Sequence, residues 1–216
     1  MTLKIDLHVH TIYSGDSVTT PAKALKEAKR KRLDGIAITD HNTVEAHRVI
    51  PTDSELLVIP GIEVSSGEGH ILGLGIREPV EAGLSAAETV RRIRQLGGVA
   101  IVPHPMAPLK SSLSRVAVMR VKPDALETLN GSTCSFISKK GMNLALRLRL
   151  PQTGGSDSHY PSEIGRAYTL IDAESSLDDV LEAVKTGRVR PSGRNASLGE
   201  MFRRLGRKAK RGKGSV

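Results

Sequence analysis

The sequence predicts a single α/β domain whose strands alternate with helices and close into a barrel. With 216 residues, 38% of them hydrophobic, the chain can bury one sizeable core but is short for two. Apolar segments of β character recur along the chain and are separated by helical patterns, as expected of βα units rather than of a sheet built from hairpins. An open doubly wound sheet is the structural alternative.

Eight segments have the character of strands. The core is expected to consist mainly of Ile, Leu, Val and Ala, because the chain has no Trp, two Phe and three Tyr. The predicted strands are Lys4–His10, Gly35–Asp40, Leu56–Val64, His70–Ile76, Val99–Pro103, Ala125–Asn130, Gln152–Ser156 and Tyr168–Ile171. About seven strands that alternate with helices are enough to close a barrel.

Four helices are predicted between these strands, at Pro21–Arg32, Ala86–Leu96, Lys139–Leu148 and Leu177–Thr186. Thr20 is placed to cap the first helix, and Pro suits the first helical position. The second is flanked by Ser85 and Gly97, and the last by Ser175 or Ser176 and by Gly187.

The positive charge is concentrated at the end of the chain. The formal charge is +9, and seven Lys and Arg residues follow the last acidic residue, Glu200, so residues 1–202 carry only about +2. We therefore expect a barrel domain at 1–200 and a basic tail at 201–216. The tail is either a solvated end or an arm that contacts nucleic acid.

The cysteine content and the apolar segments indicate the cellular compartment that we expect. The single cysteine, Cys134, can form no disulfide within the chain and cannot build a thiolate metal site. Lys4 and Asp6 interrupt the first apolar stretch, which argues against a signal peptide, and no run of ~18 apolar residues is present. We expect a soluble, cytoplasmic protein without a membrane partner.

Ionisable residues gather at the carboxyl ends of the predicted strands, where barrels and open α/β sheets place their active sites. Six of the seven histidines lie there. His8 and His10 are two apart on an extended segment, so their imidazoles project to the same side and can share a metal. Asp157 and His159 repeat this spacing. Such a cluster costs desolvation and repulsion unless bound cations compensate.

The ordered motifs resemble the polymerase and histidinol phosphatase (PHP) family over Leu3 to about Thr169. The motifs are His8-x-His10, Asp16, Thr39-Asp40-His41, Gly61-x-Glu63, His104-Pro105 and Ser156-Asp157-x-His159. The resemblance implies a distorted (β/α)7 TIM-like barrel that holds two or three divalent ions and hydrolyses a phosphate ester. An imidazole and carboxylate shell suits Zn, Mn or Fe.

The resemblance also implies which residues bind each ion. One ion would take His8, His10, Glu63 and Asp157, with Glu63 bridging to a neighbouring ion. A second would take Asp16, His41 and His159, and a third Glu63, His104 and His70. Some family members supply a later histidine where this chain has Asn130, so His70 is our expected replacement; without it the site would hold two ions. The expected catalytic residues are Asp16, His41, Glu63, Asp157 and His159.

Other residues have two interpretations each. Arg166 either contacts the substrate phosphate through its guanidinium or forms a surface salt bridge. Arg194 is a second candidate for substrate binding, or a loop charge. Asp40 either orients an imidazole from behind or caps a helix that begins near Thr43.

The leading functional hypothesis is a metal-dependent phosphoesterase. It would cleave a phosphomonoester or phosphodiester in a nucleotide, an oligonucleotide or a small phosphorylated metabolite, using a metal-activated hydroxide. The alternative is a non-catalytic barrel that binds nucleic acid, resembling the ribonuclease P protein subunit. A third possibility is a nuclease whose basic tail holds the polymer.

Overall fold

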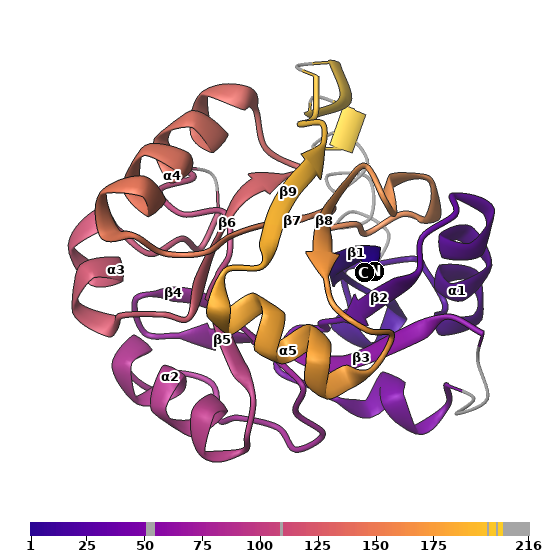
Figure 1. The fold of residues 1–216 in the computed structure, drawn as a ribbon, viewed down its shortest axis with the longest axis horizontal. Coiled ribbons are helices and arrows are strands. Elements are labelled where there is room, and N and C mark those ends of the chain that lie inside the picture. Colours follow the sequence, from indigo (N-terminus) through magenta and orange to yellow (C-terminus); the bar gives the residue numbers. More distant parts are fainter. Residues whose placement is uncertain (51–54, 109, 198, 202, 205–216) are drawn as a thin grey trace, which may run out of the picture.

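A nine-stranded sheet forms the frame of the domain and curls round on itself (Figure 1). The computed structural model describes residues 1–50, 55–108, 110–197, 199–201 and 203–204. Within this part of the chain the strands lie in the order β7-β6-β5-β4-β3-β2-β1-β8-β9. Their bounds are β1 (Thr2–Val9), β2 (Gly35–Ile38), β3 (Leu57–Ser66), β4 (Gly69–Leu74), β5 (Val99–Val102), β6 (Ala125–Asn130), β7 (Gln152–Gly155), β8 (Ala167–Asp172) and β9 (Val189–Gly193).

The sheet closes where the chain leaves β7 and meets β1. Asp157 N donates to His8 O at 2.8 Å, and His10 N donates to Ser158 O at 3.0 Å, so this segment pairs in parallel with the end of β1. Strands β1 to β7 therefore form a nearly closed barrel, which confirms the predicted α/β barrel class. Strands β8 and β9 extend the sheet beyond β1 as antiparallel neighbours.

Strands β3 and β4 form a hairpin, so the expectation of βα units throughout is wrong here. Ser66 pairs with Gly69, and β4 also runs antiparallel to β5. The two-residue link Gly67-Glu68 is far too short for a crossover helix, which needs a dozen or more residues. Gly69 has a φ of 140°, a conformation that favours glycine.

Helices surround the strands (Figure 1). They are α1 (Pro21–Arg30), α2 (Ala86–Gln95), α3 (Arg115–Val121), α4 (Ser135–Leu148) and α5 (Leu177–Thr186). The four predicted helices are confirmed, although α4 begins four residues early. The caps are also as expected, since Thr20, Ser85 and Ser176 each accept a hydrogen bond from a backbone N–H in the first turn. None of the helices in the described ranges is long and apolar enough to span a bilayer.

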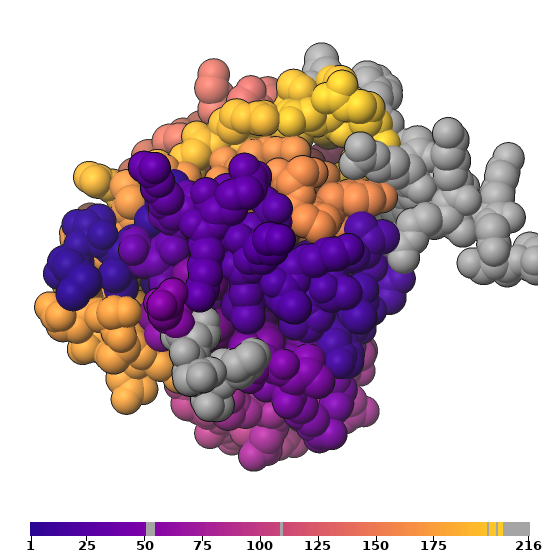
Figure 2. Space-filling model, turned by 90° about the vertical axis from the view of Figure 1, so that its right-hand side faces the viewer, coloured from indigo at the N-terminus to yellow at the C-terminus, as the bar shows by residue number. Residues whose placement is uncertain are grey.

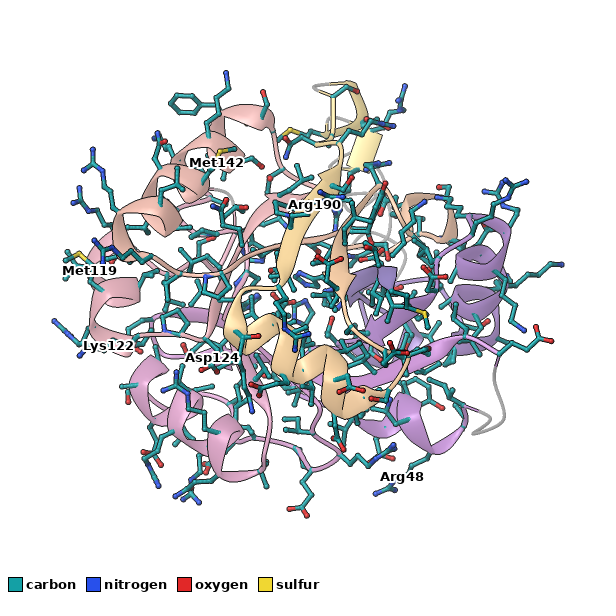
Figure 3. The ribbon with its side chains drawn as sticks, in the orientation of Figure 1. Arg48, Met119, Lys122, Asp124, Met142 and Arg190 are labelled. Atoms are coloured by element: carbon teal, nitrogen blue, oxygen red, sulfur yellow. The ribbon has the colours of Figure 1, made fainter. Side chains whose placement is uncertain are left out.

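One α-helix and one strand in the described part of the chain were not predicted. In α3 only Val118 and Val121 are buried, so this short helix lacks a long apolar stripe. Strand β9 contains Pro191 and has no fully buried residue, as is usual for a strand at the edge of a sheet. Exposed side chains of the outer layer, such as Arg48, Met119 and Lys122, extend away from the domain (Figure 3).

The barrel interior has an apolar end and a polar end. Ile59 of β3 and Ala125 of β6 pack in one apolar cluster with Val180 and Val184 of α5, which covers this end. Side chains two or four residues further along a strand face the same side of the sheet. On β3 this position is Glu63 and on β6 it is Glu127, and both are buried. The polar end therefore lies at the carboxyl ends of these parallel strands.

Gly155 allows β7 to pack closely against β1. A Cβ at this position would lie 2.5 Å from His8 Cβ and 2.6 Å from Glu127 Oε1. We expect Gly155→Ala to lower the free energy of unfolding by about 1–3 kcal/mol. Urea unfolding would show this as a lower midpoint with an unchanged slope.

The matched control is Gly67→Ala, because the atoms nearest to a Cβ at Gly67 are 3.6 Å away. We expect this variant to differ from the wild type by no more than about 0.5 kcal/mol. Equal midpoints for the two variants would contradict the close packing of β7 on β1.

Candidate metal centre

Nine ionisable side chains from both halves of the chain meet at the polar end of the barrel. A β-bulge in β1 between Asp6 and Val9 breaks the alternation, so that Leu7 packs in the interior apolar cluster while His8 contacts Glu63. The structure brings together every predicted metal-binding residue: His8, His10, Asp16, His41, Glu63, His70, His104, Asp157 and His159.

Glu63 lies at the centre of this cluster and is 1% exposed. Its two carboxylate oxygens are within 3.3 Å of five imidazoles. Oε2 lies 3.3 Å from His8 Nε2, 3.1 Å from His10 Nε2 and 3.2 Å from His41 Nδ1; Oε1 lies 3.0 Å from His70 Nδ1 and 3.3 Å from His104 Nε2. Glu63 could therefore help to hold a cation on either side, with His8, His10 and His41 at one oxygen and His70 and His104 at the other.

Asp16 and His159 form a second part of the cluster. Asp16 Oδ2 lies 2.9 Å from His159 Nε2 and 4.0 Å from His41 Nε2. Asp157 Oδ1 connects the two parts, at 3.7 Å from His10 Nε2 and 3.6 Å from His159 Nδ1. Three overlapping groups have their ligand atoms within 4.8 Å of one another: His8, His10 and Glu63; His10, His41 and His159; and His41, Glu63 and His70.

Hydrogen bonds fix the tautomers of three of these histidines. His8 Nδ1 donates to Glu127 Oε1 at 2.9 Å. Ser14 Oγ donates to Asp40 and therefore accepts from His10 Nδ1, at 2.9 Å. Ser112 Oγ donates to His104 O and accepts from His104 Nδ1, at 3.1 Å. In the neutral form of each ring the lone pair is then on Nε2, the atom that faces Glu63 and is available to a metal.

The protonation states also fit a cation. Burial lowers the pKa of His10 to about 4 and that of His41 to about 4, and it lowers the pKa of His104. Burial opposes ionisation of Glu63, but the neighbouring His8 holds the pKa of this carboxyl well below its usual range. Burial also opposes ionisation of Asp157, and here Lys110, followed by His8, holds the pKa well below its usual range. Neutral imidazoles at His10, His41 and His104 beside ionised carboxylates are the ligand states that divalent Zn, Mn and Fe require. Burial opposes a charge on His8, but Glu127 and Glu63 raise the pKa of His8 well above its usual range, so a cation would take the place of its second proton.

Glu127 is a supporting residue that the sequence did not reveal, because it lies within an apolar strand. Besides His8, it contacts His104, whose N–H donates to Oε2 at 3.0 Å, and Asn130, whose Nδ2 donates to the same oxygen at 2.7 Å. Asn130 Nδ2 also lies 3.2 Å from Asp157 Oδ2. Asn130, expected where some relatives have a histidine, thus holds two carboxylates in place.

Asp40 supports His10 rather than its neighbour His41. It accepts hydrogen bonds from Thr11 N and Thr11 Oγ1, both at 2.6 Å, and from Ser14 Oγ at 2.8 Å. Since Ser14 accepts from His10, Asp40 orients this imidazole through one hydroxyl. The capping alternative is wrong, because the short 3-10 helix Glu45–Arg48 has no side-chain cap.

The two predicted substrate-binding arginines lie beside the cluster. Arg166 Nη1 donates to Gly131 O at 3.0 Å, and its Nη2 lies 3.3 Å from Glu200 Oε1. Arg194 forms two hydrogen bonds with Glu200, at 2.8 and 2.9 Å. Both arginines line a cavity of about 690 Å³.

Arg204 of the predicted tail reaches the cluster, which the sequence did not indicate because this residue is one of seven cations in a run. Its Nη2 donates to His159 Nδ1 at 2.7 Å and to Asp157 O at 3.1 Å. Residues 205–216 of the tail lie outside the described residues, so the division at 200/201 and a nucleic-acid contact by the tail stay predictions.

Comparisons with known proteins agree with this arrangement. A family model described as PHP domain matches residues 6–106, and one described as PHP-associated matches residues 139–189. An uncharacterized protein of Methanocaldococcus jannaschii is 40% identical over 124 residues, covering 51% of this chain and 72% of the relative. The 5'-3' exoribonuclease Rnm of Salmonella typhimurium is 38% identical over 40% of this chain, a match that spans 33% of its own length.

A solved structure has a similar fold. It is a two-domain protein from Bacteroides vulgatus that contains a predicted PHP-like metal-dependent phosphoesterase. The TM-score is 0.72 at 22% identity, and the match covers 96% of this chain and 70% of the other.

Proposed function

Because the chain belongs to the PHP family, which makes it a hydrolase of phosphoester bonds, we propose that its nine clustered side chains hold two or three divalent ions at the reactive centre. The observation that carries this proposal is the position of Glu63, buried with imidazoles against both carboxylate oxygens. An unpartnered buried carboxylate would be costly, and so would this many imidazoles without a cation to bind.

Two of the three proposed ligand sets share Glu63. One ion would take His8, His10, Glu63 and Asp157; another would take Asp16, His41 and His159; a third would take Glu63, His70 and His104. When bound, such ions supply an acidified water and positive charge for the phosphoryl oxygens. This set of imidazole and carboxylate ligands suits Zn, Mn or Fe.

The substrate is proposed to approach from the side of Asp16, His41 and His159. The side chains of these residues are 31%, 22% and 10% exposed, whereas those of His8 and His10 are fully buried. Asp16 and His41 are therefore the most accessible members of this ligand set. We place catalysis on Asp16, His41, Glu63, Asp157 and His159.

The proposed substrates are phosphomonoesters or phosphodiesters, with a nucleotide, an oligonucleotide or a phosphorylated metabolite as the remaining group. The similarity to an exoribonuclease supports nucleic acid as one candidate. A barrel that only binds nucleic acid has no use for so complete a set of metal ligands, so the non-catalytic alternative is not favoured. A cytoplasmic location stays a prediction.

Metal analysis combined with an ester assay tests this proposal. Protein stripped with a chelator and reloaded with Mn²⁺ or Zn²⁺ is expected to retain two or three ions per chain and to hydrolyse 4-nitrophenyl phosphate or bis(4-nitrophenyl) phosphate. The stripped protein is the control. Retention of the ions without hydrolysis of either ester would contradict the proposal.

A further inference from the structure

The cavity that contains Arg166 and Arg194 lies next to the metal centre and has a volume of about 690 Å³. Its walls come from the end of α1, the link between β7 and β8 with the start of β8, the end of β9, and the helical residues 200, 203 and 204. Figure 2 shows the C-terminal segment, in yellow, along the upper edge of the molecule against orange segments that precede it in sequence. This volume falls within the range of small-molecule sites.

The walls carry more positive than negative charge. Lys31, Arg166, Arg194, Arg203 and Arg204 line the cavity together with two carboxylates. One of these, Glu163, is buried and accepts a hydrogen bond from His159 N at 3.1 Å. The other, Glu200, is bound by Arg194 and lies near Arg166.

The cations repel one another. Burial lowers the pKa of Arg166, and the guanidiniums of Arg194 and Arg204 lower it further against the influence of the two glutamates. An anion in the cavity would relieve this repulsion. Guanidinium groups suit the oxygens of a phosphate, which accept paired hydrogen bonds.

Arg204 joins the cavity to the metal centre. It lines the cavity and also lies 3.5 Å from Asp157 Oδ1 and 2.7 Å from His159 Nδ1. Its Nη1 is buried and has no hydrogen-bond partner among the residues that the structure describes. A group in the cavity is therefore one side chain away from the proposed ligands Asp157 and His159.

We propose that this cavity binds a second phosphate of the substrate while the scissile phosphate occupies the metal centre. The inference rests on the proposed function and narrows it: the preferred substrates are esters that carry two phosphates, as neighbouring nucleotides of an oligonucleotide do.

A pair of chromogenic esters tests the preference. Thymidine 5'-(4-nitrophenyl phosphate) has one phosphate, and its 3'-phosphorylated derivative has two. For the Mn²⁺-loaded wild type, we expect kcat/KM to be about tenfold higher for the derivative, because a charge-assisted contact to one further phosphate has this magnitude. The measured quantity is the ratio of the two kcat/KM values.

Two variants should move this ratio in opposite directions. Arg194→Gln removes a cation and should bring the ratio close to one. Glu200→Gln should raise it several-fold, because it frees Arg194 and Arg166 from a carboxylate. Glutamine at this position can still serve in the capping box with Ser197, whose Oγ accepts from Glu200 N. The matched control is Arg91→Gln, on the exposed face of α2, which should leave the ratio unchanged.

Calorimetry with inorganic phosphate gives a second readout that needs no catalysis. Metal-free wild type should bind phosphate about tenfold more tightly than metal-free Arg194→Gln, and no more tightly than Glu200→Gln. Equal kcat/KM for the two esters, or a ratio unaffected by Arg194→Gln, would overturn the inference and leave the proposed function intact. Failure to hydrolyse either ester with metal bound would overturn the proposed function, and the inference with it.

Discussion

Replacement of Glu63 by glutamine is expected to lower kcat/KM for any phosphate ester by about a thousandfold, the scale on which loss of one partner from a buried charged cluster acts. Both carboxylate oxygens of Glu63 face imidazole nitrogens, at 3.0 to 3.3 Å. Glutamine is nearly the same size but offers one acceptor, and its amide NH₂ would face either the His8 group or the His70 group. It also removes the charge shared by the proposed ions.

The measurements are metal content after gel filtration and initial rates on a chromogenic ester. The variant should lose at least one ion per chain and show the rate defect at every Mn²⁺ concentration, because a bridging ligand is missing. Glu88→Gln, which changes an exposed glutamate on α2, is the matched control and should behave as the wild type. A Glu63→Gln protein with full metal content and a normal rate would show that Glu63 is not a metal ligand.

Most of the nine proposed ligands could be predicted because they stand near the carboxyl ends of strands and belong to an ordered series of short motifs; Asp16 lies in a loop, and His70 lies near the start of β4. His8 and His10 are two residues apart on an extended segment, so their side chains point to the same side. The bulge in β1 turns this side toward the barrel interior. Barrel closure was harder to foresee. It depends on the bonds of Asp157 and Ser158 with β1, between residues that are about 150 positions apart.

The residues that were missed have partners far away in sequence. Glu127 occupies one position in an apolar strand, and its importance comes from His8 and His104 on other strands. Lys110 contacts Asp157 from a loop that has no recognisable motif. Arg204 could not be distinguished from the other cations of the tail. The hairpin of β3 and β4 was missed for a local reason, since the predicted strands end at Val64 and begin at His70, which leaves out the residues that pair next to the turn.

Glu127→Gln is expected to weaken metal binding by about 10- to 100-fold, the usual effect of losing a group that orients a ligand. Glutamine can accept from His8 Nδ1 or from His104 N and Asn130 Nδ2, but it cannot do both. One side of its amide must then place a donor against another donor. If the His8 bond is lost, the imidazole is free to carry its proton on Nε2, the nitrogen proposed to bind the metal.

The response to added metal separates this positioning role from a ligand role. Activity of Glu127→Gln should recover as Mn²⁺ is raised, because the ligands themselves are intact, whereas Glu63→Gln should not recover. Glu182→Gln, on α5 at the opposite end of the barrel, is the matched control and should leave the metal affinity unchanged. If Glu127→Gln lowered only the urea midpoint and bound Mn²⁺ with wild-type affinity, Glu127 would be a residue of the packed interior alone. Its hydrogen bonds to His8 and to the backbone of His104 lead us to expect the opposite, because two of the proposed ligands are held by this one carboxylate.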